Sequence, residues 1–454
     1  MQERFTQQYI DNAQPGQSSV EDAIDSKQPG PGHLTRGLNV GIIGGAIAGC
    51  ASAGLLHRAG CNVTVFERSK GNLEDRGVGL SMKIPTLNAL KQRDMIDQDM
   101  PFVPVWRRIF ARPHKGAPAD DSPWDTYWDE PVAIHANHWG VLYRNLRQRV
   151  PDHIYRQGCE VTGITEHADG TVEVQLADGT THSFDLVICA DGYESVGRRV
   201  LYPDAEIQLT TYFTWRGMID EWNVPRPDVF EEKLIFFGYE SGHAFIYFVP
   251  SPEHGGTVGK RRLNWAFQET ITGKDVPGVP PDENGYVQRG LAPGAATPEQ
   301  IEYCRAIARQ HFPAYFADIV DLTPQPFTQP IRDMGVPNYV RGHICLMGDA
   351  AILARPHIGA GASKALDDAL ALADALASPN TLAAALAAWE VERSAVGREL
   401  LDLGRSLGKH IVEAPPAWDA MDPAAMVKWW QEVIGERYWF WLGDVAEYHP
   451  TGGR

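Results

Sequence analysis

The sequence predicts an α/β protein in which a three-layer domain on a parallel sheet is interrupted by an antiparallel sheet and followed by a helical C-terminal region. Three observations predict this fold. A strand, glycine turn, helix and second strand occupy residues 39–67, aromatic-rich strand patterns fill residues 206–330, and long helical patterns occupy residues 362–410. With 454 residues, 43% of them hydrophobic, the chain can build two or three cores.

Composition excludes several classes of protein. The formal charge of −17 makes a nucleic-acid partner unfavourable, because an acidic surface repels phosphates. The six cysteines are scattered without a C-x-x-C pair, which indicates reduced core thiols rather than disulfides or a metal site. No apolar run reaches the roughly 18 residues of a membrane span, and the polar N-terminus does not resemble a signal peptide. We therefore expect a cytoplasmic protein without bound metal.

Residues 39–67 contain the pattern of a dinucleotide site. The turn GGAIAG at residues 44–49 joins a short apolar run to a helical segment, and Glu67 ends the following apolar run. Glycines let the backbone approach a pyrophosphate, the helix N-terminus offers free N–H groups, and the acid can accept hydrogen bonds from a ribose. Ala46 stands where the strict motif has its second glycine. The turn alone leaves FAD, NAD and no ligand open.

The remaining patterns divide the chain into segments. Strand-like runs at 107–111 and 161–184, helical runs at 86–91, 141–150 and 297–312, and an aromatic loop with Trp124, Tyr127 and Trp128 are expected. Residues 5–10 form at most a short helix. The predicted organisation is a flexible extension (1–36), a dinucleotide domain in two parts (37–205 and 331–410), an inserted antiparallel-sheet domain (206–330) and an aromatic-rich C-terminal segment (411–454).

Three short segments follow predicted buried strands. They are the glycine turn with Glu67, Asp191-Gly192, and Gly348-Asp349. Each places small residues or an acid at the carboxyl end of a sheet strand, where open α/β sheets bind ligands. We expect these three segments to form one site.

This combination resembles the single-component flavoprotein aromatic hydroxylases of the p-hydroxybenzoate-hydroxylase type, over roughly residues 39–376. The resemblance is carried by GDAAILARPHIGAGASKALDDALALA from residue 348 and by DGYESVGR from residue 191. The glycine turn, the TWRG segment at 214–217 and the Arg-Pro-His loop at 355–357 are similar to the 2,6-dihydroxypyridine 3-hydroxylase branch. The resemblance implies that the three-layer domain is a Rossmann-like FAD-binding domain.

The resemblance also implies roles in FAD binding. Asp349 accepts from the ribityl chain, the helix after Gly359 faces the flavin pyrimidine edge, and Arg144 lies near the phosphates. A turn aspartate and a solvated arginine are the simpler alternatives. The predicted cofactor-binding residues are Gly44, Gly45, Ala46, Ala48, Gly49, Glu67, Arg68, Gly79, Arg144, Asp191, Gly192, Gly348, Asp349, Pro356, Gly359, Ala360 and Gly361.

One departure from the family pattern affects the catalytic assignment. Many relatives carry His after Gly-Asp-Ala-Ala, where this chain has Ile352. His357 and His243 are therefore the candidate catalytic residues, as a base or hydrogen-bond partner for a substrate hydroxyl. Arg216, Tyr247 and Arg355 are the candidate substrate-binding residues. For side chains on a sheet face, simple packing is the alternative.

The implied activity is aromatic hydroxylation. NADH or NADPH, as a transient co-substrate, reduces FAD, O2 forms a flavin C4a-hydroperoxide, and one oxygen is transferred to an electron-rich phenol-like or hydroxypyridine-like ring. Rivals of the same fold are a decarboxylating salicylate-type hydroxylase and a tailoring monooxygenase that acts on a larger aromatic intermediate. Rivals of another class are an NAD-binding dehydrogenase and a non-catalytic dinucleotide-binding protein. The aromatic tail suggests a homodimer.

Overall fold

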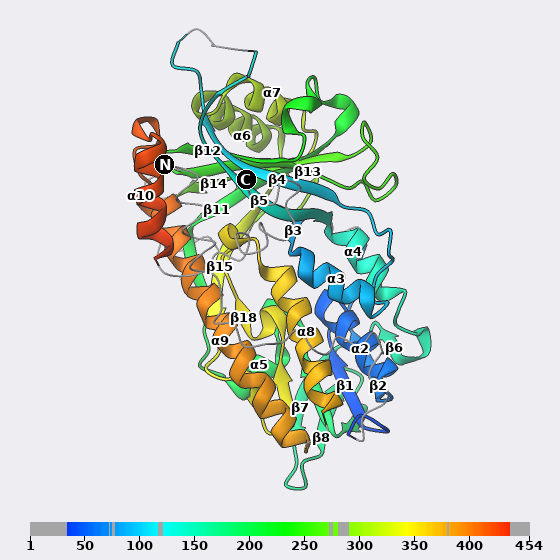
Figure 1. Cartoon of the computed structure of the whole chain (residues 1–454). Coiled ribbons are helices and arrows are strands. Elements are labelled where there is room, and N and C mark those ends of the chain that lie inside the picture. The colour runs from blue at the N-terminus through cyan, green and yellow to red at the C-terminus, as the bar shows by residue number, and fades with distance from the viewer. Residues whose placement is uncertain are drawn as a thin grey trace, which may run out of the picture.

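The computed structural model describes residues 34–71, 73–74, 78–116, 121–271, 276–279, 290–378 and 381–435. These residues form a parallel-sheet domain, shown in the lower half of Figure 1, and a larger sheet with its own helices, shown in the upper half. The expected helix at residues 5–10 and the aromatic residues 438–441 lie outside the described residues.

The first sheet has six strands in the order β16-β17-β10-β1-β2-β6. Its centre is parallel: β1 (Asn39–Ile43) pairs with β2 (Asn62–Glu67) and with β10 (Leu186–Cys189), and β10 pairs with β17 (Ile344–Leu346). At its edges, β6 (Tyr155–Gln157) pairs in parallel with β2, and β16 (Val340–Arg341) pairs antiparallel to β17. The three segments predicted to form one site therefore follow neighbouring strands at one edge of this sheet.

Two different layers cover this sheet. Helices α2 (Ile47–Arg58) and α8 (Gly361–Ala377) pack against each other on one face. The small sheet β7 (Val161–Glu166), β8 (Val172–Leu176) and β9 (Thr181–Phe184) covers the other, where the Phe66 and Phe184 rings lie 6.0 Å apart. The predicted meander and the three-layer arrangement are thereby confirmed.

The second sheet has nine strands in the order β18-β15-β11-β14-β13-β12-β4-β5-β3. Residues 206–335 supply five of them: β11 (Gln208–Asp220), β12 (Lys233–Tyr239), β13 (Gly242–Val249), β14 (Arg262–Thr270) and β15 (Phe327–Gly335). These pair antiparallel to one another, as expected from their period-two patterns.

Earlier and later segments also join this sheet. They are β3 (Gly79–Met82), β4 (Val103–Arg112), β5 (Asp125–His138) and β18 (Ile352–Leu353), and β4 pairs in parallel with β12. The expectation of an aromatic loop around Tyr127 and Trp128 was wrong, because both residues lie in β5. The reason is that their side chains pack on a neighbouring strand, which a reading of the local sequence does not reveal.

The two faces of the second sheet differ. On β11, Trp215 lies on the face covered by α6 (Pro298–His311) and α7 (Ala314–Leu322), where its indole N–H donates to Glu269 at 3.1 Å. Tyr212, Thr214 and Arg216 alternate onto the opposite face, which meets the parallel-sheet domain. This alternation decides which side chains can face a ligand held between the two sheets.

Helices complete the fold. The helices expected at 86–91 and 141–150 are α3 (Ile84–Gln92) and α4 (Trp139–Arg147), and α5 (Val196–Leu201) follows β10. The long helix α9 (Leu382–Gly408) runs along both domains in Figure 1 and ends in a π-helical turn, Lys409–Glu413. Trp418 then packs against Gly238 of the large sheet, and α10 (Pro423–Ile434) is the last described helix.

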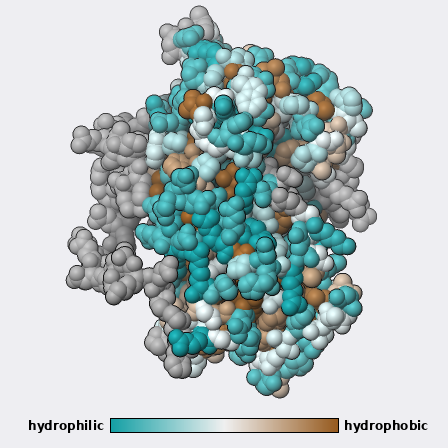
Figure 2. Space-filling view, turned by 90° about the vertical axis from the view of Figure 1, so that its right-hand side faces the viewer, coloured by the Kyte–Doolittle hydropathy of each residue, from teal (hydrophilic) through white to brown (hydrophobic). Residues whose placement is uncertain are grey.

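The surface and the cysteines agree with the composition. All six cysteines are free, and five are buried. Figure 2 shows one face of the molecule, on which hydrophilic residues predominate and hydrophobic ones are dispersed among them. Among the described residues, no helix is both long and apolar enough to cross a membrane.

Candidate functional site

The turn between β1 and α2 leaves a helix N-terminus open. Gly44 has φ +94°, and a Cβ at this position would lie 2.5 Å from the Ala190 carbonyl oxygen, so only glycine fits. Ala46 is the N-cap of α2, and no described side chain caps this helix. Glu67 is buried at the end of β2, where its carboxylate accepts from the Gly45 and Ser69 N–H groups, each at 2.8 Å. The turn can therefore bind a phosphate beside an acid.

Asp191 and Gly192 follow β10, the strand next to β1. One Asp191 oxygen accepts from the Val196 N–H at 2.7 Å, at the start of α5. The other oxygen is buried without a described partner, and burial raises the pKa of this carboxyl. A Cβ on Gly192 would meet no described atom within 4 Å, so the backbone there is open to a ligand.

Gly348 and Asp349 follow β17, and a buried arginine ties them to the previous turn. Arg198 donates to the carbonyls of Tyr193 and Ala350, the latter at 3.4 Å. The Asp349 residue is solvent-accessible, yet burial raises the pKa of its carboxyl, and the nearby Lys364 ammonium partly offsets this effect. The accessibility and the raised pKa agree if the carboxylate lies in a recess, where water reaches it and protein surrounds it. Such a recess suits a polyol chain.

The loop after β18 leads into a second open helix N-terminus. Pro356–Ile358 form a single 3-10 turn, and Gly359 adopts φ +63° before the N-cap residue Ala360. No described side chain caps α8, and a Cβ on Gly361 would meet no described atom within 4 Å. The positive end of the helix dipole can stabilise negative charge on a ring placed there.

These features fit FAD. The uncapped N-terminus of α2 beside Glu67 suits the diphosphate and the adenosine ribose. The recessed Asp349 carboxylate suits the ribityl hydroxyls, and the uncapped N-terminus of α8 suits the flavin ring. Among the described residues, no cluster of His, Cys, Asp or Glu could hold a metal ion.

Three other predicted cofactor residues are engaged by protein groups. Arg68 pairs with Glu194 at 2.8 Å on a partly exposed surface. Arg144, on α4, pairs with Glu74 at 2.6 Å and donates to the Pro252 carbonyl at 3.3 Å. A Cβ on Gly79 would lie 2.8 Å from the Tyr247 hydroxyl oxygen, so the backbone of the edge strand β3 closely approaches the Tyr247 side chain. This contact brings a predicted cofactor residue and a predicted substrate residue together.

The two predicted catalytic histidines lie together where the domains meet. The ring centroids of His243, on β13, and His357 are 5.8 Å apart. Burial lowers the pKa of His243 to about 3 and that of His357 well below its usual value, so both are neutral at neutral pH. His357 Nε2 lies 2.9 Å from the Tyr212 hydroxyl oxygen, and its Nδ1 is buried without a described partner.

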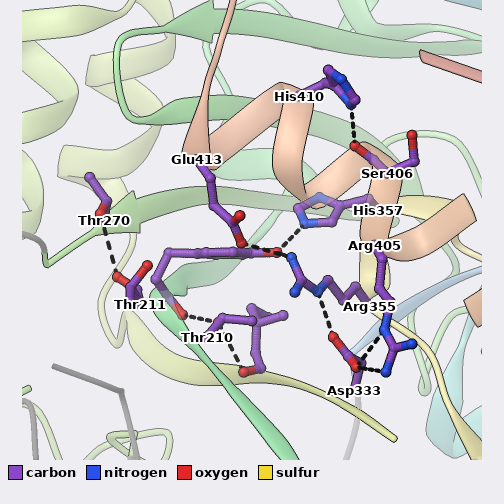
Figure 3. A network of polar contacts seen from close by, with 12 residues as sticks. Thr210, Thr211, Thr270, Asp333, Arg355, His357, Arg405, Ser406, His410 and Glu413 are labelled. Atoms are coloured by element: carbon purple, nitrogen blue, oxygen red, sulfur yellow. Dashed lines mark hydrogen bonds and ion pairs between the residues drawn. The ribbon is translucent and has the colours of Figure 1, made fainter. Parts of the chain in front are cut away.

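Arg355 lies in a network of ion pairs beside His357 (Figure 3). Its Nε donates to Asp333 at 2.8 Å, and its Nη1 donates to Glu413 at 2.9 Å and to the Tyr212 hydroxyl at 3.2 Å. Arg405, from α9, also donates to Asp333, at 2.7 Å. The network lines a cavity of about 510 Å³, with the lining residues Gln208, Leu209, Thr210, Thr211, Asp333, Arg355, Arg405 and Glu413.

Several polar groups were not predicted from the sequence. They lie on the inner face of the large sheet, the face that meets the parallel-sheet domain. The polar atoms Thr214 Oγ1, Asn264 Nδ2 and Gln268 Oε1 are buried without described partners, as is Nε of the predicted Arg216. Thr214 pairs with Gln268 across β11 and β14, which places their side chains on the same face as Arg216. The available signal was polar residues at alternate positions in otherwise aromatic strands.

Comparisons with known proteins agree with this geometry. A family model described as FAD binding domain-like matches residues 209–333. The 2,6-dihydroxypyridine 3-monooxygenase of Paenarthrobacter nicotinovorans is 27% identical over 381 residues, which cover 82% of this chain and 91% of that protein. The 3-amino-4-hydroxybenzoate 2-monooxygenase of Streptomyces cremeus is 26% identical, with 85% of this chain and 91% of that protein covered.

A solved structure shares the fold. The 2,6-dihydroxypyridine-3-hydroxylase from Arthrobacter nicotinovorans superimposes with a TM-score of 0.74 at 24% identity, covering 86% of this chain and 95% of that chain. This likeness confirms the predicted fold class, an α/β protein with a helical C-terminal region.

Proposed function

We propose that this chain, an FAD-dependent monooxygenase of the aromatic-hydroxylase family, acts on a small aromatic or heteroaromatic ring that carries a negatively charged group. The enzyme uses NAD(P)H and O2 to hydroxylate an electron-rich ring. FAD supplies the redox chemistry when bound, since it accepts the reducing equivalents of NAD(P)H and activates O2. The residues of the chain bind and orient the two rings and exclude water.

The positive charge of Arg216 is the main observation that supports a negatively charged substrate. Arg216 is partly buried, and burial lowers the pKa of its guanidinium. Its Nη1 donates to the neutral Gln329 side chain at 2.9 Å, whereas its Nε is buried without a partner. In the described part of the chain no carboxylate lies within 4 Å of it. A partly buried cation without a counterion attracts an anion, so an anionic substrate group would complete the site.

The neighbouring polar atoms would orient the ring. Asn264 Nδ2 is a donor and Gln268 Oε1 an acceptor, and both lie on the same strand of the inner face. Tyr247, also on this face, lies close enough to Arg216 to feel its charge. A ring with oxygen or nitrogen substituents on two edges would satisfy these groups, as hydroxypyridines and hydroxybenzoates do.

The FAD-facing elements would perform two further tasks. The open N-terminus of α8 would stabilise negative charge on the reduced flavin ring, and Asp349 would bind the ribityl hydroxyls. A substrate whose ring hydroxyl is deprotonated is already electron-rich, which favours attack by an electrophilic oxygen.

A comparison of charged and neutral rings tests the substrate class. Rings with a carboxylate or an acidic hydroxyl should stimulate NAD(P)H oxidation by the FAD-loaded protein, whereas their methyl esters or ethers should not. Arg216→Gln should abolish this discrimination, while Arg332→Gln, on the β15 strand of the same sheet, should retain it. Equal stimulation by charged and neutral rings would refute the proposal. Release of CO2 in the same assay would identify a decarboxylating enzyme.

Two properties of the whole molecule complete the proposal. The free, mostly buried cysteines suit the reducing cytoplasm. The aromatic C-terminal segment, of which Trp429 and Trp430 are described, suits a homodimer interface. Light scattering on full-length protein and on protein truncated after residue 435 would test the second property, since only the full-length protein should be a dimer.

A further inference from the structure

His357 is the last of three side chains that are linked by hydrogen bonds, and the first of them is the charged Arg355. Arg355 Nη1 lies 3.2 Å from the Tyr212 hydroxyl oxygen, which in turn lies 2.9 Å from His357 Nε2. All three side chains are largely buried, so water does not replace these contacts. We propose that these two hydrogen bonds fix His357 as the Nδ1–H tautomer, so that His357 meets its ligand as a neutral hydrogen-bond donor.

The assignment follows from the donors and acceptors available. An arginine guanidinium has five N–H donors and no acceptor, so the Tyr212 oxygen must accept from Arg355. The Tyr212 hydroxyl hydrogen is then free to donate to His357 Nε2, which must carry a lone pair. In a neutral imidazole the proton is therefore on Nδ1.

The opposite tautomer leaves more groups unsatisfied. If His357 carried its proton on Nε2, it would donate to the Tyr212 oxygen, and the buried Tyr212 O–H would lack an acceptor among the described contacts. His357 Nδ1 would also remain unpaired. In the Nδ1–H tautomer, only the Nδ1–H group lacks a partner. Buried unpaired polar groups are unfavourable, which selects this tautomer.

The surrounding charges keep the ring neutral. His243 faces His357 from β13, Tyr212 from β11, and Arg355 from two positions earlier in the same loop. Beyond them, Asp333 and Glu413 are already paired with Arg355, and Asp333 also with Arg405. No carboxylate in the described part of the chain pairs with His357. Burial, together with His243 and Arg355, lowers the pKa of His357.

The remaining Nδ1–H group requires an acceptor from outside the described residues. Resting on the proposed function, this acceptor is an oxygen or a nitrogen lone pair of the aromatic substrate or of the flavin ring. A protonated Nδ1 cannot remove a proton from a phenol, so this inference replaces the expected role of His357 as a base. Tyr212 and Arg355 become positioning residues, and neither was predicted for this role from the sequence.

Histidine NMR tests the assignment without turnover. The FAD-loaded enzyme is labelled with ¹⁵N-histidine, and the His357 signals are those lost in His357→Asn, or in His357→Gln if the first variant does not fold. We expect a neutral ring with its proton on Nδ1. Tyr212→Phe removes the donor to Nε2. It should shift the pair of ¹⁵N resonances from Nδ1 and Nε2 of His357 toward the values of mixed tautomers. Tyr247→Phe, a buried tyrosine of the same sheet, is the matched control and should leave the pair unchanged.

Three outcomes would overturn the inference: a proton on Nε2 in the wild-type enzyme, a doubly protonated ring at neutral pH, or an unchanged pair in Tyr212→Phe. Since the spectrum needs no substrate, a failure of the proposed substrate class would not affect it. In turnover assays, Tyr212→Phe should lower kcat on the order of tenfold with little change in KM.

The same spectra identify the acceptor. The Nδ1–H proton resonance should move downfield when its hydrogen bond forms. A shift on loading the protein with FAD assigns the flavin, and a shift only after addition of 2,6-dihydroxypyridine assigns the ring substrate. A resonance that moves in neither step would contradict the donor role.

Discussion

The Lys364 ammonium lies 2.7 Å from the Asp368 carboxylate, and the two side chains bind both polar atoms of Gly348. Lys364 Nζ donates to the Gly348 carbonyl at 3.1 Å, and the Gly348 N–H donates to Asp368 at 3.2 Å. Arg393, from α9, completes the cluster with a bond to Asp368 at 2.9 Å. Helix α8 therefore holds the turn that carries Asp349, and its own N-terminus, which we propose faces the flavin, has no side-chain cap among the described residues.

Lys364→Met should destabilise the protein and weaken FAD binding. Asp368 would keep Arg393, so the expected loss of unfolding free energy is about 2 kcal/mol rather than the full cost of an unpaired buried carboxylate. Urea unfolding of the FAD-free protein measures this loss. Lys83→Met, which removes a half-buried lysine 4.0 Å from Asp367, is the control and should cost less than about 1 kcal/mol. Equal losses in the two variants would contradict the role of Lys364.

Asp349→Ala should weaken FAD binding by roughly 10- to 100-fold, since it removes a charged hydrogen-bond acceptor from the recess. The stability of the FAD-free protein should change little, because this exposed side chain makes no hydrogen bond to another described residue. Titration of the FAD-free protein with FAD, followed by flavin fluorescence, measures the dissociation constant. Asp374→Ala, on α8 but paired with Arg93 at the surface, should bind FAD normally.

His243 should make stability depend on pH in weak acid. Unfolded histidine binds a proton below about pH 6.5, whereas burial lowers the pKa of folded His243 to about 3. Between these values the unfolded state binds more protons, so stability falls by about 1.4 kcal/mol per pH unit as the pH is lowered. His243→Phe should remove this contribution from the slope. The exposed His254→Phe serves as the control, and an unchanged slope in His243→Phe would show that His243 is protonated in the folded protein.

Gly238 and Trp418 should be energetically coupled. A Cβ on Gly238 would lie 2.2 Å from Trp418 Cδ2, so Gly238→Ala should cost about 1–3 kcal/mol through overpacking. Trp418→Ala alone should cost about 3–5 kcal/mol through the cavity it leaves. In the double variant the alanine methyl occupies part of that cavity, and its cost should largely disappear. Additive losses would mean that the C-terminal segment does not pack on β12. Gly71→Ala, with no atom within 4 Å of a new Cβ, is a neutral control.

The FAD-binding half was accessible from sequence because its constraints are local. A turn that only Gly44 fits, and an acid at the end of the next strand, leave a pattern within 30 residues. The second and third turns are recognisable for the same reason, since each follows a short buried strand.

The substrate half depends on contacts between distant segments. Thr214 meets Gln268 across two strands, and Tyr212 meets His357 across 145 positions of the chain. Residues 79–138 join the large sheet through pairing between β4 and β12, which no local pattern reveals. Arg355 illustrates the limit, because a loop arginine beside a predicted catalytic residue suggests a substrate contact, whereas its partners are Asp333 and Glu413 from remote segments.

Oxygen incorporation tests the central claim most directly. FAD-loaded protein is supplied with NAD(P)H, isotopically labelled O2 and a set of hydroxylated benzoates and pyridines, and the products are examined by mass spectrometry. We predict that at least one anionic ring stimulates NAD(P)H oxidation and gains one labelled oxygen atom. A protein that binds no FAD, or that oxidises NAD(P)H without labelling any ring in the set, would contradict the account.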